Sequence, residues 1–377
     1  MRYARFAPFP VWALFLVMGF TACTDSTDPI QVFPPPGPVP ASLEIIGPSQ
    51  GQVGDDIALA AVVRDAAGDT LRQVAVTWSS SDTVRIPLSL VKTASGASAA
   101  SGAIVKPQRI ATARVIVSAG ALRDTVVFTS SLSPYAFVFA DTVSASQRQL
   151  ILDAVQDAHA FHQTMLGRLI AESTTVTGAF SAPGCNNGGA AAYTGPHAVV
   201  FCLANPGWKN NGPVRQQKIV QHELFHVWQF ENHWTGNAAT AGATWLIEGS
   251  AEWMGYKGID ALGLLSFETA LGCQIKESSD FATRTPPGLP PLSSVETQAA
   301  FQSTQGPLYT HSMLAAEYLI QTAGLLAFRS YVEAIAAGTE WHAAFQSAFG
   351  ISTTTFYNQF PTWLSARPVP ASYLCGI

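Results

Sequence analysis

The stretch HELFH occupies residues 222–226 and lies inside the longer segment VRQQKIVQHELFHVWQFENHW. Apolar residues recur in this segment at the spacing of one helix face, at Ile219, Val220, Leu224, Val227 and Trp228. Pro213 precedes the segment, and proline suits the first position of a helix because its missing N–H needs no partner there. We therefore predict a helix from 213 to about 232, with Asn211 or Gly212 as its cap.

Two histidines four residues apart on this helix, His222 and His226, lie on one face about one turn from each other. Both imidazoles can therefore reach a single metal ion, and Glu223 would stand over the open side of that ion. An amphipathic helix can also carry two surface or core histidines at this spacing by chance. A third ligand elsewhere in the chain would favour a metal site over a chance pair of histidines.

The same helix does not contain a third ligand at the position that a metzincin peptidase uses. A metzincin peptidase carries a further histidine six residues beyond the second one, and that position is Asn232 here. His233 comes one place late, and a histidine at a helix end commonly interacts with the last carbonyl groups. The metzincin class is thereby excluded.

The segment WLIEGSAEW, residues 245–253, offers the ligand instead. It resembles the gluzincin metallopeptidase helix written W-L-x-E-G-x-A-E, and the resemblance implies that Glu248 is the third ligand. It also implies that Glu252 braces a zinc-bound histidine, since such an imidazole commonly needs a hydrogen-bond partner that fixes its orientation. Two carboxylates four residues apart repel each other on an exposed helix, and a nearby cation removes that repulsion.

The wider resemblance is to peptidase MA-like proteins. It covers roughly residues 215–365, including the segments YTHSMLAAEYLIQTAG and EWHAAFQSAFG. It implies an α+β, thermolysin-like zinc metallopeptidase domain over 134–377, with a helical C-terminal part. The spacing from His226 to Glu248 is wider than in the M1 aminopeptidases, and their G-A-M-E-N motif is missing. The resemblance therefore does not extend to aminopeptidase activity.

The implied chemistry is hydrolysis of a peptide bond with one Zn²⁺ ion. Three protein ligands and one open place are typical of catalytic zinc, whereas structural zinc is normally closed by four ligands and favours Cys. The ion would polarise the peptide carbonyl and acidify its water, and Glu223 would take the proton and pass it to the leaving amine. By resemblance Tyr309 donates a hydrogen bond to the oxyanion, and His311 is the other candidate donor.

The first residues, MRYARFAPFPVWALFLVMGFTAC, have the layout of an export signal over 1–22, with a positive start, an apolar run and small residues. The ending FTAC resembles the bacterial lipobox, which implies that Cys23 carries lipid; a plain secretory signal is the alternative. Residues 23–40 form a Pro-rich tether. We expect an exported protein of the bacterial cell envelope, anchored to the membrane through lipid on Cys23, or otherwise secreted.

Four further cysteines, Cys185, Cys202, Cys273 and Cys375, make an even count in an exported chain and predict two disulfides. Three pairings are possible in principle. Cys185 and Cys202 bracket a short segment, so we pair them with each other and pair Cys273 with Cys375.

Residues 41–131 consist of short β-branched runs separated by turns, which is the spacing of an all-β sandwich. The passage VVRDAAGDTLRQVAVTWSSSD resembles bacterial Ig-like group 2 domains, in which Trp78 would be a core residue. Such a module implies a spacer or adhesive role. The expected fold class is therefore multi-domain, with an Ig-like sandwich followed by the metallopeptidase domain.

The composition limits the partners of the protein. The chain carries 20 Lys and Arg against 25 Asp and Glu, a formal net charge of −5, and has no basic runs. Nucleic acid is excluded as a partner because its phosphates need a basic patch. We expect a peptide or protein substrate. The alternative function is that of a catalytically inactive surface adhesion or binding protein on a metallopeptidase fold.

Overall fold

The structure is a computed structural model, and it describes residues 38–91, 102–167, 170, 173–182, 185, 191–232, 243–284, 288–304 and 306–372. The predicted export signal, Cys23 and the tether up to residue 37, His233 and Cys375 lie outside these residues. Within them the chain contains both β-sheets and helices, and its buried side chains form two separate hydrophobic cores. No helix in this described part of the chain is long and apolar enough to cross a membrane.

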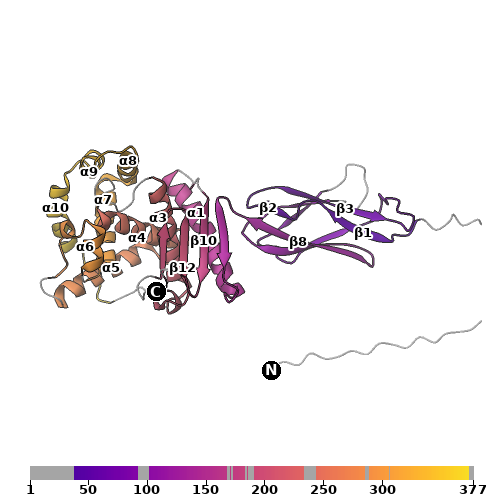
Figure 1. Ribbon diagram of the computed structural model, residues 1–377, viewed down its shortest axis with the longest axis horizontal. Helices are drawn as coiled ribbons and strands as arrows, with labels where there is room; N and C mark the ends of the chain where they lie inside the picture. The colour runs from indigo at the N-terminus through magenta and orange to yellow at the C-terminus, as the bar shows by residue number, and fades with distance from the viewer. Residues whose placement is uncertain are drawn as a thin grey trace, which may run out of the picture. The chain divides into compact units, whose positions relative to one another are not determined.

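The N-terminal part, up to Ser131, is built from two four-stranded sheets (Figure 1). One sheet has the order β1 (Ser42–Ile46), β3 (Ile57–Arg64), β6 (Gly102–Val105) and β5 (Leu88–Val91). The other has the order β2 (Gln50–Gln52), β8 (Leu122–Ser131), β7 (Thr112–Ala119) and β4 (Thr77–Ser80). Side chains on both sheets point into one core, which contains Leu59, Val105, Val115 and Phe128.

The strand that carries Trp78 begins later than its sequence indicates. The run VAVTW predicts a strand over its whole length, but β4 starts at Thr77. Thr77 pairs with Ser118 near the end of β7, and Gly120, with a φ of 58°, then turns the chain into β8. Residues 74–76, the first part of this run, therefore belong to no strand. Trp78 itself lies partly buried against the core.

The second part of the chain contains a mixed sheet with the order β9 (Tyr135–Phe139), β10 (Thr174–Ala179), β12 (Ala198–Cys202) and β11 (Ala192–Gly195). β10 runs parallel to β9 and β12, whereas β11 is antiparallel at the edge. Parallel strands need a crossover, and α1 (Ala145–Leu166) supplies the one between β9 and β10. The side chain of Ser144 caps the start of α1 by accepting a hydrogen bond from the N–H of Gln147, and Gly167 ends the helix in the left-handed conformation.

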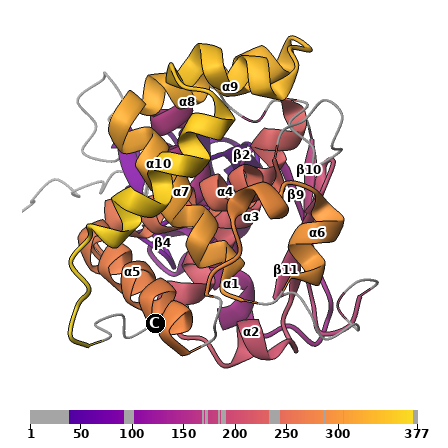
Figure 2. The same ribbon diagram turned by 90° about the vertical axis from the view of Figure 1, so that its left-hand side faces the viewer.

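Helices form the rest of the second part (Figure 2). They are α2 (Pro206–Lys209), α3 (Pro213–Glu231), α4 (Thr244–Ala261), α5 (Phe267–Arg284), α6 (Gln298–Ser303), α7 (Leu308–Ala323), α8 (Leu325–Ala336), α9 (Trp341–Phe349) and α10 (Thr353–Ser365), with a 3-10 turn at Leu292–Ser294. α3 has Gly212 as its cap, as predicted. α7 contacts α4, α5, α8, α9 and α10, so it is the central helix of the group.

Glycines allow α4 to approach its neighbours closely. A Cβ atom added at Gly249 would lie 2.2 Å from the carbonyl oxygen of Ser312 on α7. One added at Gly258 would lie 2.5 Å from the side chain of Gln221 on α3. Real side chains do not come this close, so α4 packs against both helices only because these positions lack a side chain. This packing sets the distance between the polar residues of α3 and those of α4.

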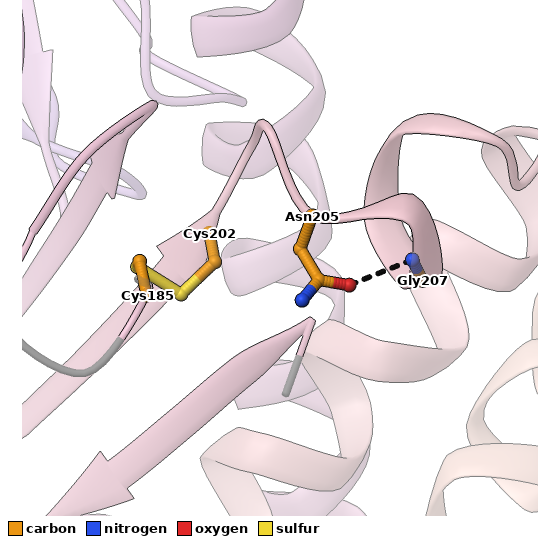
Figure 3. Close-up of a disulfide and its surroundings, with 4 residues drawn as sticks. All are labelled: Cys185, Cys202, Asn205 and Gly207. Carbon is orange, nitrogen blue, oxygen red and sulfur yellow. Dashed lines mark hydrogen bonds between the residues drawn. A yellow bond between two sulfur atoms is a disulfide. The ribbon is translucent and has the colours of Figure 1, made fainter. Parts of the chain in front are cut away.

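Cys185 and Cys202 form a disulfide, as predicted, and their Cα atoms lie 5.3 Å apart (Figure 3). Figure 3 also shows Asn205, whose side-chain oxygen accepts a hydrogen bond of 2.7 Å from the N–H of Gly207 and so caps α2. Cys273 is disulfide-bonded as well. Its predicted partner, Cys375, lies outside the described residues, so that pairing stays a prediction.

Candidate metal centre

Three side chains from two helices converge on one point: His222 and His226 from α3, and Glu248 from α4. The Nε2 atoms of the two histidines lie 3.0 Å apart. The Oε2 atom of Glu248 lies 3.5 Å from Nε2 of His222 and 3.4 Å from Nε2 of His226. The structure therefore brings the whole predicted ligand set together.

His226 is held in place by Gln229, one turn further along α3. Its Nδ1 atom lies 2.6 Å from Oε1 of Gln229. The amide nitrogen of Gln229 donates to the carbonyl oxygen of Ile247 and to Oγ of Ser250, both at 3.0 Å. Since that nitrogen is the donor, Oε1 must be the acceptor, and Nδ1 of His226 carries the hydrogen. The Nε2 atom of His226 is then left with a free lone pair.

His222 is held in the same way by Glu252, the predicted bracing carboxylate. Its Nδ1 atom lies 2.9 Å from Oε2 of Glu252, which accepts the hydrogen bond. The other oxygen of Glu252 accepts from the ammonium group of Lys218, one turn before His222 on α3. Lys218 is only 9% exposed, and its ammonium group also lies 5.0 Å from the ring centre of Tyr256. This lysine is the cation that offsets the second carboxylate of α4.

The charge on Glu252 follows from that contact. Burial raises the pKa of a carboxyl group, but the charge of Lys218 and the hydrogen bond to His222 outweigh it and hold the pKa of Glu252 at about 2. Glu252 is therefore ionised near neutral pH and acts as an acceptor only. The Nδ1 atom of His222 must then carry a hydrogen, so in the neutral imidazole the lone pair is on Nε2, as in His226.

The fit of these residues to a metal ion can be tested on the donor atoms themselves. When both imidazoles are neutral, two lone pairs and one carboxylate oxygen face one another, and this arrangement needs a shared positive charge, either a proton on a histidine or a metal ion. Ligand atoms at the usual zinc distances and tetrahedral angles lie about 3.3–3.4 Å apart. The three separations, 3.0, 3.4 and 3.5 Å, match this value. The residues therefore fit a zinc ion with one open place.

The electrostatics of the site favour added positive charge. Burial opposes protonation of His222, but the carboxylates of Glu248 and Glu252 outweigh it and raise its pKa to about 9. Burial also raises the pKa of Glu248, yet the two neighbouring histidines lower it to well below its ordinary value. A divalent cation supplies the same positive charge without any proton.

Glu223 lies beside the three ligands and has a partner that its sequence context does not reveal. The hydroxyl of Thr194, on β11, lies 2.6 Å from Oε2 of Glu223 and 3.1 Å from its backbone carbonyl oxygen. The shorter distance indicates that the hydroxyl donates to the carboxylate. Glu223 is 8% exposed, so this hydrogen bond restricts a nearly buried side chain. Thr194 therefore fixes which way the carboxylate of Glu223 points.

For the peptide hydrolysis that the sequence predicts, Thr194→Val should lower the rate, because valine keeps the shape of threonine but cannot donate to Glu223. We expect kcat to fall about 10–100-fold, the equivalent of one hydrogen bond to a charged group, with KM changed little. Thr194→Ser retains the hydroxyl and should restore most of the rate. Steady-state kinetics on a peptide substrate measure both variants. A valine variant at the wild-type rate, or a serine variant as slow as valine, would contradict the assigned role.

The ligands and Glu223 line a cavity of about 440 Å³ between β11, α3, α4, α6 and α7. Tyr309, the predicted oxyanion donor, lines the same cavity, and its ring centre lies 6.2 Å from that of His222. The negative charge of Glu248, with those of Glu223 and Glu252, raises the pKa of the Tyr309 phenol above its ordinary value. The hydroxyl of Tyr309 therefore stays protonated and able to donate. His311, the other candidate donor, lines a different cavity and does not line this one.

Three residues of the site escaped sequence reasoning: Lys218, Gln229 and Thr194. The sequence indicates two of them, because residues three or four apart on a helix are neighbours. Lys218 comes four residues before His222, and Gln229 comes three residues after His226. Thr194 carries no such signal, because it lies on a separate strand.

Comparisons with known proteins identify no relative. No family model and no curated protein matches this chain. The chain is similar to solved structures of the surface layer protein SbsC, domains 1–6 (13% identity, TM-score 0.23, covering 26% of this chain and 13% of that one). It is also similar to domains 4 and 5 of S-layer protein SbsC (13% identity, TM-score 0.22, covering 25% of this chain and 53% of that one). A third similar structure is the ZirS C-terminal domain (9% identity, TM-score 0.21, covering 32% of this chain and 88% of that one). The chain thus covers less than two thirds of the first two structures, and TM-scores this low establish no common fold.

Proposed function

We propose that the protein is an exported zinc-dependent metallopeptidase. The observation that carries the proposal is the convergence of two imidazole lone pairs and the carboxylate of Glu248 on one point, with Glu223 in the same cavity. A structural zinc site would be closed by a fourth protein ligand, and the fourth side faces a cavity here. An open place next to a carboxylate is the arrangement that hydrolysis requires.

Each of these residues of the cavity has a separate role in the proposed hydrolysis. When bound, zinc supplies Lewis acidity toward a peptide carbonyl and makes a water molecule more acidic. His222, His226 and Glu248 would hold the ion. Glu223, oriented by Thr194, accepts the proton of the attacking water and delivers it to the leaving amine. Tyr309 donates a hydrogen bond to the oxygen of the former carbonyl as negative charge develops there.

The position of β11 supports a peptide as the substrate. Among the described strands β11 is one of the two edges of its sheet, and three of its residues, Ala192, Tyr193 and Thr194, line the cavity. An edge strand has backbone N–H and C=O groups that can pair with an extended chain. A peptide added beside β11 would pass the metal centre and place a scissile bond near Glu223.

Tyr309→Phe should lower kcat by about 10²–10³-fold, because removing one oxyanion donor typically has that effect. Zinc content and melting temperature should stay as in the wild type, since half of the Tyr309 side chain is exposed at the cavity mouth. The matched control is Tyr193→Phe, a second tyrosine of the same cavity, which should stay within a few-fold of the wild type. Steady-state kinetics test both variants. Activity of Tyr309→Phe within a few-fold of the wild type would remove Tyr309 from the mechanism.

The strand orders of the N-terminal part and of the second part of the chain each support a fold. We propose an Ig-like sandwich for the N-terminal part, supported by its strand orders β1-β3-β6-β5 and β2-β8-β7-β4 and their common core. With β1 as strand A and β2 as an additional edge strand beside β8, this is the pairing of an ABED sheet with a CFG sheet. For the second part we propose a thermolysin-like fold, supported by the mixed sheet with an antiparallel edge strand beside the HExxH helix.

Export and anchoring belong to the same proposal. The disulfide between Cys185 and Cys202 supports an oxidising compartment, since such bonds persist outside the cytosol. The signal-like start and Cys23 support attachment to the bacterial cell envelope by lipid. The N-terminal part would then act as a spacer between the membrane and the catalytic part.

A cleavage profile on a mixed peptide library tests the proposed activity. The purified chain is loaded with zinc, and mass spectrometry identifies the new termini and their distance from the peptide ends. Cleavage within peptides would indicate an endopeptidase, and cleavage near one end an exopeptidase. A zinc-loaded chain that cuts no peptide would favour the inactive binding protein instead.

A further inference from the structure

A second cavity lies in the helical region, away from the metal ligands. It has a volume of about 450 Å³ and is formed by residues of α5, α7 and α10 and of the segment around Leu292. None of the predicted metal ligands lines it. α7 separates the two cavities, because Tyr309 lines the cavity of the metal centre and His311 lines the second one.

The walls of this second cavity are mainly apolar. They include Ile275, Leu289, Leu292, Phe360, Leu364 and Val369. No Asp or Glu is among the lining residues, and the one charged residue there is Arg367. A guanidinium nitrogen of Arg367 already donates to Gln321 at 2.8 Å, and the group lies 4.1 Å from the ring centre of Trp363. Volume and composition are those of a small-molecule site.

Two polar side chains in this cavity have no partner among the described residues. His311 is 7% exposed, its Nδ1 atom is fully buried, and its ring contacts Phe360 without any hydrogen bond. Ser278, on α5, is 2% exposed and also makes no side-chain hydrogen bond with a described residue. Buried polar groups are normally paired, and a buried group without a partner, such as Nδ1 of His311, lowers stability. A ligand with a polar group would satisfy both side chains.

The charge state of His311 limits the chemistry of that ligand. Burial lowers the pKa of His311 to about 4, so its imidazole is neutral near pH 7. A neutral imidazole and a hydroxyl can each donate one hydrogen bond and accept another. They do not offset the desolvation of a buried ion. A cation would find no carboxylate in the lining, and the guanidinium of Arg367, the one cation there, is already held by Gln321 and Trp363. An uncharged hydrogen-bonding group on an apolar body fits the cavity best.

We propose that this cavity binds an uncharged amphiphile, with its aliphatic body against the apolar walls and a hydroxyl group hydrogen-bonded to His311 and Ser278. The site is independent of the metal centre. The bound molecule would contact α7 on the side opposite Tyr309.

Calorimetric titration of the full zinc-loaded chain with octan-1-ol tests this proposal, and octanoate is the charged comparison. We expect saturable binding of one octan-1-ol per chain and at least about tenfold weaker binding of octanoate. His311→Phe keeps an aromatic ring but has no nitrogen, and it should weaken octan-1-ol binding about tenfold. Ala282→Phe, at an exposed position of α5 that lines the cavity, should fill it and abolish binding.

Melting temperatures control for folding. His311→Phe should melt no lower than the wild type, because it removes an unpaired buried polar group. Absence of saturable octan-1-ol binding to the wild type would overturn the proposal. Equal binding to wild type and Ala282→Phe would place the ligand elsewhere and overturn it too. Equal binding to His311→Phe, or tighter binding of octanoate, would refute the assigned head-group chemistry.

Discussion

Glu223→Gln should keep zinc bound and lose peptide hydrolysis by about 10³-fold. The carboxylate is the only group beside the metal ligands in the described cavity that is placed to accept the proton of an attacking water. Glutamine has almost the same shape and can still accept the hydrogen bond from Thr194, so the fold and the three ligands should be unaffected. It cannot act as a base, and general-base catalysis contributes about 10²–10⁴-fold to such reactions.

The measurement combines metal analysis and kinetics on the same purified sample. Wild type and Glu223→Gln should contain equal zinc, about one ion per chain, and differ only in kcat. Glu223→Asp serves as the second variant, because it keeps a carboxylate but shortens its reach and should retain partial activity. A Glu223→Gln enzyme as fast as the wild type would refute the mechanism.

His226→Ala should remove zinc and, with it, all activity. The Nε2 atom of His226 lies 3.0 and 3.4 Å from the other two donor atoms, and Gln229 holds the ring in that orientation. Without this imidazole two protein ligands remain, which is fewer than the three that catalytic zinc sites use. The zinc content should therefore fall from about one ion per chain to a small fraction of that value.

The matched control is His342→Ala, which also removes one imidazole. His342 lies on α9, and about half of its side chain is exposed beside Glu340. This variant should retain its zinc. Elemental analysis of both variants after gel filtration gives the result. Full zinc content in His226→Ala, with zinc also retained by His342→Ala, would mean that the metal sits elsewhere.

Much of the site could be predicted because its parts are local in sequence. His222, Glu223 and His226 follow from one helical spacing, and Glu248 with Glu252 follow from the resemblance of WLIEGSAEW to the gluzincin helix. The structure places all five where their patterns indicated, with Glu252 at 2.9 Å from His222 and Glu248 within 3.5 Å of both histidines. The pairing of Cys185 with Cys202 was predictable for the same reason, since the bond closes a short segment.

The unpredicted features depend on contacts between distant segments. Thr194 reaches Glu223 only because β11 is the sheet edge beside α3, and nothing in its neighbouring residues indicates this. The close approach of α4 to α7 depends on Gly249 lying against Ser312, which a sequence shows only as one more glycine. The late start of β4 at Thr77 likewise depends on where β7 ends. Long-range pairing of this kind overrides local preference.

The site also shows how the repulsion between the carboxylates of Glu248 and Glu252 is offset. Glu248 and Glu252 on one helix face should repel each other on an exposed helix. Lys218 contacts Glu252, and the two histidines contact Glu248, so each carboxylate has its own positive or hydrogen-bonding partner. The repulsion is therefore offset by residues of α3 rather than by a solvent-exposed partner on α4.

The measurement that tests the central claim most directly is hydrolysis of an unstructured protein such as casein before and after zinc is removed. The wild-type chain should release peptides, lose that activity when a chelator strips the zinc, and regain it when one equivalent of zinc is returned. Peptide release is followed by mass spectrometry, with Glu223→Gln carried through the same steps as a blank. A chain that carries its zinc and leaves the casein intact, or that cleaves it equally well without zinc, would contradict the account.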